Sequence, residues 1–296
     1  MMRRTVPLLI LIAVLLSGCA AAQSPQAQIA ATTLPVYEFT TRLCDGTGLT
    51  VSRLVTEPVS CLHDYTLNVR QVRSAEAAEL IVISGAGLED FLADILDSKT
   101  IIDSSSGISL LEGSHDHTHG EEDASHEGHH HEEDPHIWLS PVNAGIMAQN
   151  IADGLCLQYP QHSERINANL QTLLAELETL QTYGKQQLSS LQCRELITFH
   201  DGFAYLAHSF DLTILEAVEE ESGSEASASE LIHLIEEVRH HSLPAIFTER
   251  LGSTSAAQII AAETGVKTYT LDMAMHGEGY FSAMYHNIDT LKGALE

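Results

Sequence analysis

The fold class is indicated first by residues 80–84, Leu80-Ile81-Val82-Ile83-Ser84, a short apolar run that ends at a serine. A helical pattern over Asn68–Ala78 precedes this run, and a further apolar run, Leu49–Val55, lies before the helix. Short apolar strands that alternate with helices form parallel sheets whose faces the helices cover. We therefore predict an α/β fold, with the folded part beginning at Ile29.

The same alternation returns in the second half of the chain, which predicts a second sheet. The expected strands are Glu195–Phe199, Leu212–Leu215, Ala245–Thr248 and Lys267–Leu271. The helices expected between them include Ser229–His240 and Ser255–Thr264. Two α/β lobes are the most economical interpretation.

Between these halves, Pro160 opens a stretch in which large apolar residues recur every three or four positions, which predicts one apolar stripe on a helix. The stripe consists of Ile166, Leu170, Leu173, Leu177 and Leu180. About 30 helical residues would give a connector roughly 45 Å long. The expected boundaries are 29–159 for the first lobe, 160–191 for the connecting helix and 192–296 for the second lobe.

The N-terminus predicts export. Arg3 and Arg4 precede an apolar run, Val6–Leu16, that is too short to cross a bilayer and is typical of a signal peptide over residues 1–18. The motif Leu16-Ser17-Gly18-Cys19 resembles a bacterial lipobox, which implies cleavage before Cys19 and lipid attachment there. We expect residues 19–28 to tether the protein outside the cytoplasm, at the cell surface or in the periplasm. An ordinary secreted protein is the alternative.

Composition points to metal handling. The chain has 14 Lys+Arg against 41 Asp+Glu, a formal net charge of −27, and 17 histidines. Phosphate backbones need clusters of basic residues, so the charge argues against nucleic-acid binding. Imidazole and carboxylate groups in an acidic protein attract divalent metal ions instead.

Four cysteines follow the predicted leader. An even number in an exported chain predicts two disulfides. Pairing in sequence order is the simplest of three connectivities, and the sequence leaves the other two open. That pairing joins Cys44 to Cys61 and Cys156 to Cys193.

Residues 112–134 are rich in His, Glu and Asp and contain no aliphatic residue larger than alanine, so a mobile loop is expected. The loop holds a His-Glu-x-x-His match at His126–His130. Metalloprotease chemistry needs that motif on a buried helix, so a loop broken by Gly128 argues against it. Weak, exchangeable metal binding is expected of the loop, and a solvated spacer is the alternative.

Outside the loop, four residues stand where fixed metal ligands are expected. His63, His200 and Asp272 each come after a predicted strand, and His136 begins the ordered stretch that follows the loop. The carboxyl ends of strands in α/β folds face the crevice that binds small partners. Directly after His200, a helix is expected to begin at Asp201. Three imidazoles and one carboxylate would satisfy a tetrahedral zinc site.

These motifs resemble the zinc-binding lipoproteins of bacterial metal ABC importers, the cluster A-I solute-binding family. The resemblance implies two α/β lobes joined by a long rigid helix, with the metal in the interlobe cleft. It also implies that His63, His136, His200 and Asp272 are the ligands. The matching stretches are Ala31–Tyr37, His63–Tyr65, Gly85–Glu89, Asp134–Pro141, Phe199–Tyr205 and Ile246–Glu249.

The residue at position 200 bears on the choice of metal. Manganese-importing relatives typically have glutamate there, and the softer imidazole of His200 suits zinc. After Asp272 the family usually continues Pro-Leu, whereas this chain has Met273-Ala274. The fourth ligand could thus be Asp272, a water molecule or a loop group such as Glu278. Glu249 follows a predicted strand and could orient a ligand imidazole by accepting its other N–H. A simple surface or helix N-terminal charge is the alternative.

The expected function is a monomeric, non-catalytic extracytoplasmic receptor that captures Zn²⁺ and delivers it to a membrane ABC permease. A manganese receptor of the same fold and a surface zinc buffer or adhesin without transport are the alternatives. A glutamate patch, Glu219-Glu220-Glu221 with Glu225, could touch the permease.

Overall fold

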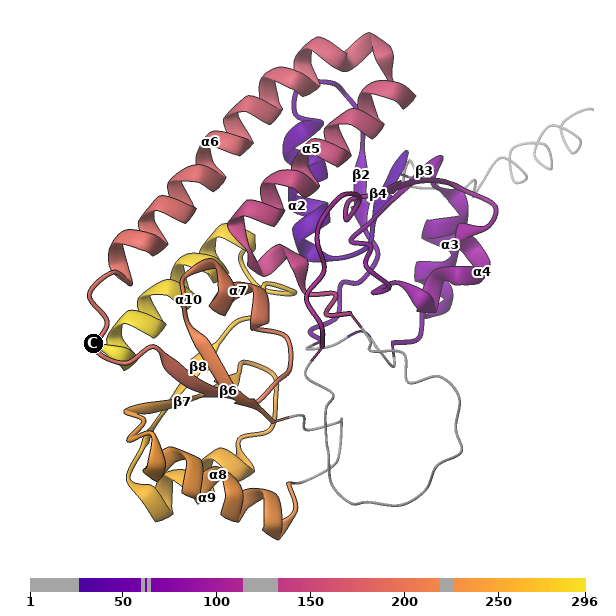
Figure 1. The fold of residues 1–296 in the computed structure, drawn as a ribbon. Coiled ribbons are helices and arrows are strands. Elements are labelled where there is room, and N and C mark those ends of the chain that lie inside the picture. Colours follow the sequence, from indigo (N-terminus) through magenta and orange to yellow (C-terminus); the bar gives the residue numbers. More distant parts are fainter. Residues whose placement is uncertain (1–26, 60–61, 63–64, 114–132, 219–225) are drawn as a thin grey trace, which may run out of the picture.

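The computed structural model describes residues 27–59, 62, 65–113, 133–218 and 226–296. They form two parallel four-stranded sheets with helices on their faces, one sheet in each lobe (Figure 1). This confirms the predicted two-lobe α/β fold. Cys19 with the predicted leader and most of the histidine-rich loop lie outside the described residues, as do Cys61, His63 and the glutamate patch.

The first sheet has the strand order β2-β1-β3-β4, with every neighbouring pair parallel. Side chains alternate between its faces: Leu80 and Val82 enter the main apolar core, whereas Ile81 enters a smaller core under α3 and α4. Continuous apolar strands are expected where both faces of a sheet are covered. The strands are β1 (Ile29–Ala31), β2 (Val51–Arg53), β3 (Leu80–Ile83) and β4 (Thr100–Asp103).

The second sheet repeats this arrangement with the order β6-β5-β7-β8, again parallel throughout. Along β7, Ala245 and Phe247 face the main core, and Ile246 faces the core beneath α8 and α9. The strands are β5 (Glu195–Thr198), β6 (Thr213–Ala217), β7 (Ala245–Glu249) and β8 (Lys267–Leu271).

Local sequence signals explain several helix boundaries. Asn68 and Ser227 each form a capping box with the residue three positions later, which starts α3 and α8. The first-lobe helices are α2 (Leu34–Leu43), α3 (Val69–Ala77), α4 (Ala93–Leu96) and α5 (Pro141–Gln158), with 3₁₀ turns at Asp90–Leu92, Ile137–Leu139 and Pro160–His162. The second-lobe helices are α7 (Ala204–Ser209), α8 (Ala228–His240), α9 (Ser255–Thr264) and α10 (Tyr280–Leu295).

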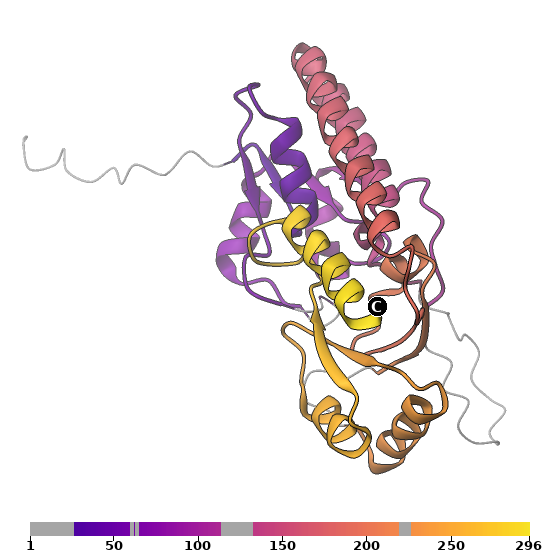
Figure 2. The ribbon, with the colours of Figure 1, turned by 90° about the vertical axis from the view of Figure 1, so that its left-hand side faces the viewer.

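The long helix α6 (Ser163–Gln187) has 25 residues and spans roughly 37 Å along both lobes (Figures 1 and 2). It packs against α2 and α5 of the first lobe and α10 of the second. Its predicted apolar stripe, from Ile166 to Leu180, is buried. The helix begins after the 3₁₀ turn at Pro160 and ends at Gln187, so it is shorter than the expected connector.

The sequential disulfide pairing is wrong. Cys44, Cys156 and Cys193 are free thiols. Cys156 lies beside Ser163, where α6 starts, and Cys193 follows the other end of α6, so the two are separated by far more than the roughly 7 Å between Cα atoms that a disulfide tolerates. Cys44 is buried in the main core, where loss of solvation raises the pKa of its thiol to about 12.

The helix expected at Asp201 begins instead at Ala204, because residues 199–202 form bends and a turn after β5. Within the described ranges, no helix combines the length and apolar character needed to cross a bilayer.

Candidate metal centre

Three of the predicted site residues of the second lobe gather at the carboxyl ends of its strands. His200 follows β5, Glu249 is the last residue of β7, and Asp272 comes directly after β8. The chain runs from β5 out to β6 and then returns to the other side of β5 as β7. Such a reversal of strand order opens a crevice at the strand ends, where α/β folds bind ligands.

His136 comes from the first lobe and is held in one orientation. It is 2% exposed, and Oδ1 of Asp134 lies 2.8 Å from its Nδ1 and also accepts its backbone N–H. Because a carboxylate can only accept, Nδ1 is the donor in this contact, which leaves Nε2 as the nitrogen available to a metal. A carboxylate behind the ring is the usual way in which proteins orient a metal-binding imidazole.

The structure brings His136 and His200 together. Their ring centroids lie 5.4 Å apart at an interplanar angle of 81°. Trp138 packs edge-on against the His136 ring and Phe203 against the His200 ring. Two imidazoles from different lobes therefore meet in largely apolar surroundings.

Glu249 lies beside the Nδ1 edge of the His200 ring. Its Oε2 is 3.7 Å from Nδ1 of His200, and its side chain is almost fully buried. Burial raises the pKa of Glu249 to about 7, and the neighbouring charge of Asp272 adds to that rise. The carboxylate is placed where the sequence predicted an orienting group.

Asp272 is held by its own loop. Its Oδ1 accepts the N–H of Ala274, and its Oδ2 lies 3.3 Å from Nε of Arg250. The Asn287 side chain accepts a hydrogen bond from the backbone N–H of Asp272 and donates one to its backbone carbonyl.

Not all of the predicted ligands converge in this structure. Among the described residues, His136, His200, Glu249 and Asp272 do not offer three ligand atoms within 4.8 Å of one another. Glu278 lies apart from them and lines a cavity of about 570 Å³ with Glu38 and Arg42, between α2 and the loop before α10. His63 is outside the described residues.

Hydrogen bonds across the lobe junction hold this arrangement. Trp138 Nε1 donates to the carbonyl of Met273, and the Tyr280 hydroxyl donates to the carbonyl of Trp138. Tyr205 donates to the carbonyl of Asp134, next to His136. Sequence reasoning missed these contacts, as well as Arg250 and the His136–Asp134 bond, although the motif Asp134-Pro135-His136 could have suggested that bond.

The centre offers imidazole nitrogens and carboxylate oxygens, a donor set that suits zinc and related transition metals. His136 and His200 meet where the two lobes join.

Comparisons with known proteins show the family of the chain. Residues 29–294 match the family described as ZnuA, the periplasmic component A of a zinc-uptake complex. The zinc-binding lipoprotein AdcA of Streptococcus pneumoniae strain R6 is 32% identical over 284 residues, which cover 89% of this chain and 55% of that protein. The chain thus spans about half the length of the curated relatives of this type.

Solved structures show the same fold. A crystal structure of ZnuA superposes with a TM-score of 0.76 at 30% identity, covering 91% of this chain and all of that one. The zinc-bound ZnuA-like domain of Streptococcus pneumoniae AdcA gives a TM-score of 0.76 at 27% identity, covering 91% and 99%. With the family match over almost the whole described chain, these likenesses show that the protein belongs to the ZnuA family of zinc-uptake complex components.

Proposed function

We propose that this protein captures a Zn²⁺ ion between its two lobes, outside the cytoplasm, and delivers it to a membrane ABC permease. The observation that carries the proposal is the meeting of His136 and His200, one from each lobe, with ring centroids 5.4 Å apart. A ligand shared by two lobes couples metal binding to their relative position, and no catalytic step is involved.

His136 and His200 supply the two ligands supported by geometry, at Zn–N distances of about 2.0 Å. His63 and Asp272 complete the proposed set. For Asp272, coordination requires its Oδ2 to exchange Arg250 for the metal. Glu249 acts through His200 by accepting a hydrogen bond from Nδ1–H when Nε2 binds the ion.

Zinc is favoured over manganese because imidazoles outnumber carboxylates in this set. The zinc-binding names of the AdcA relatives and the zinc-bound neighbour support the same choice. Delivery to a permease follows from membership of a family of uptake-complex components. Attachment through a lipid on Cys19 and a monomeric state complete the proposal.

Competitive titration with Zn²⁺ and Mn²⁺ tests the proposal. The mature chain is compared with a version that lacks residues 115–131, and each is also made as His200→Ala. His208→Ala is the matched control, because His208 is an exposed histidine on the adjacent helix α7. We expect one tight zinc site that survives loop deletion, resists manganese, is lost in His200→Ala and is kept in His208→Ala.

Two outcomes would contradict the proposal. Loss of tight binding on loop deletion alone would identify a histidine-rich zinc buffer. Equal competition by manganese would identify a manganese receptor of the same fold.

A further inference from the structure

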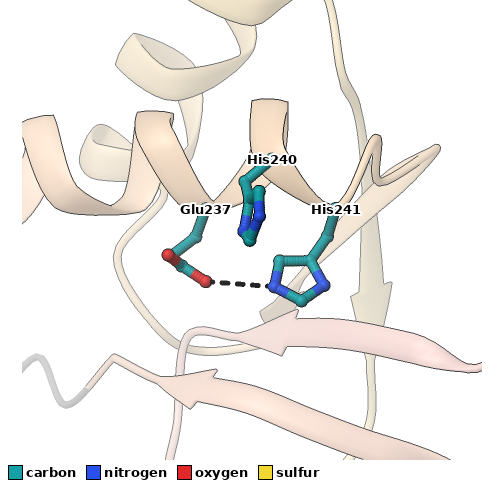
Figure 3. A group of neighbouring side chains, drawn as sticks. All are labelled: Glu237, His240 and His241. Carbon is teal, nitrogen blue, oxygen red and sulfur yellow. Dashed lines mark ion pairs between the residues drawn. The ribbon is translucent and has the colours of Figure 1, made fainter.

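A second cluster of metal-binding side chains lies at the end of α8. Among the described residues, one set of three His, Cys, Asp or Glu ligand atoms lies within 4.8 Å of one another, and it comes from Glu237, His240 and His241 (Figure 3). Positions three and four residues apart share one face of a helix, which brings both imidazoles beside the carboxylate.

His241 is oriented by a carboxylate from another element. Its Nδ1 lies 2.8 Å from Oε2 of Glu195, the first residue of β5, so Nδ1 carries the proton. Its Nε2 lies 3.4 Å from Oε2 of Glu237. A divalent cation bound to both atoms would take the place of a proton between them. This pairing of a carboxylate with a histidine is how proteins hold ligand imidazoles.

His240 and the helix end complete the site. The His240 ring stands edge-on to that of His241, with centroids 4.8 Å apart, and its side chain is exposed. The last carbonyls of a helix carry partial negative charge, which favours a cation at this position. The nearby cation, Arg239, bonds the carbonyl of Glu263 on α9.

This cluster is separate from the interlobe centre. Glu195 begins β5 and His200 follows its end, so about five residues of extended chain, roughly 16 Å, separate the two positions. Helix α8 also packs on the face of the second sheet opposite α10, toward the outer end of the lobe (Figure 1).

We propose that Glu237, His240 and His241 form a second, surface site for a divalent transition metal ion, with zinc preferred, and that Glu195 positions His241. Three protein ligands leave one tetrahedral position for water. The proposal does not depend on the function of the interlobe centre, because the two sites share no residue.

Crystals of the full chain grown with Zn²⁺ and measured at the zinc absorption edge provide the direct test. An anomalous peak bonded to Glu237, His240 and His241 at about 2.0 to 2.2 Å is expected. Absence of zinc there, beside a zinc ion elsewhere in the same crystals, would overturn the proposal and leave His241 as a protonated bridge between two carboxylates.

Equilibrium dialysis of the full chain against Zn²⁺ tests the site in solution. We expect His240→Gln/His241→Gln to bind one zinc ion fewer than the parent, and Glu195→Gln to weaken that site about 10- to 100-fold. His233→Gln is the matched control, because His233 lies on α8 and pairs with Glu216 at 3.2 Å, outside the cluster. Unchanged stoichiometry in a double variant with parental circular dichroism would refute the proposal.

Discussion

The two lobes share one strand order, but the loops that follow the central strands are held by different contacts in each lobe. In the first sheet β1 lies between β2 and β3, and in the second β5 lies between β6 and β7. A buried glutamate sits at the carboxyl edge in both places, Glu89 in the first lobe and Glu249 in the second, and burial raises the pKa of each to about 7.

Protein donors saturate the carboxylate of the first lobe. Glu89 accepts hydrogen bonds from the Thr32 hydroxyl after β1 and from the backbone N–H groups of Ser84 and Gly85 after β3. The carboxylate therefore ties together the two loops that would otherwise line a crevice.

In the second lobe, Glu249 faces an imidazole at 3.7 Å and the carboxylate of Asp272. Among the described residues, no backbone N–H donates a hydrogen bond to the Glu249 carboxylate. The same topology thus gives a rigid support in the first lobe, where protein donors satisfy the carboxylate, and in the second lobe it carries the proposed zinc site.

The largest effect is expected from Glu89 in the first lobe, on the free energy of unfolding. Glu89→Ala should lower the free energy of unfolding by about 4 kcal/mol, because three donors lose their buried acceptor and a cavity remains. Urea denaturation measures the change. Asp90→Ala is the control, since that exposed carboxylate should change stability by less than about 0.5 kcal/mol. A cost for Glu89→Ala near that of the control would break the comparison.

The pH dependence of stability should reveal the same carboxylate. The folded-state pKa of Glu89 is raised to about 7 from an ordinary 4.5, so the folded protein holds a proton that the unfolded chain loses between these values. Stability from this group is thus complete below pH 4.5 and is lost as pH rises through 7, by roughly 3 kcal/mol in all.

Urea denaturation at pH values from 5 to 8 checks this for the parent and for Glu89→Gln, which cannot titrate there. The stability advantage of the parent over the variant should shrink as pH rises. A difference independent of pH would show that Glu89 does not change protonation in this range.

For Glu249 in the second lobe, the expected effect is on zinc affinity. Glu249→Gln should weaken zinc binding about 10- to 100-fold, because the His200 ring loses its orienting carboxylate. Zinc competition on the chain without residues 115–131 measures it. Glu89→Gln is the matched change at the first edge and should leave affinity near that of the parent; an equal loss in both variants would erase the distinction.

The smallest effect is expected from the glycine beside His200. A Cβ at Gly202 would lie 2.8 Å from Cδ2 of His200 and 2.6 Å from Cε of Met273, so Gly202→Ala should displace the ring and weaken zinc binding roughly three- to tenfold. Zinc competition and urea denaturation are measured together.

Gly85→Ala provides the contrast at the first edge. Gly85 has φ +86° and a Cβ there would overlap Asp103 and Ser105. Its substitution should lower stability by about 1 kcal/mol or more while sparing zinc affinity. The comparison fails if both alanine variants lose affinity equally.

Much of the fold could be predicted because most buried parallel strands have continuous apolar sequences. The apolar runs at 80–84 and 245–248 match β3 and β7 within one residue at each end. The expected strand at 267–271 also matches β8, although this strand is mostly exposed. Helix α10 was not predicted, since it begins after Gly279 with no side-chain cap. Strand β4, Thr100–Asp103, was not predicted either.

The amino-acid sequence by itself determined the residue types of this protein: its acidic balance, its many histidines, the apolar strands and the histidine at position 200. These follow from local chemistry and from periodicity along the chain. Only the tertiary structure decided which groups meet. It placed His136 against His200, separated Cys156 from Cys193 by the length of α6, and set Glu195 behind His241. Such contacts join residues far apart in the chain, and they depend on packing that no local pattern contains.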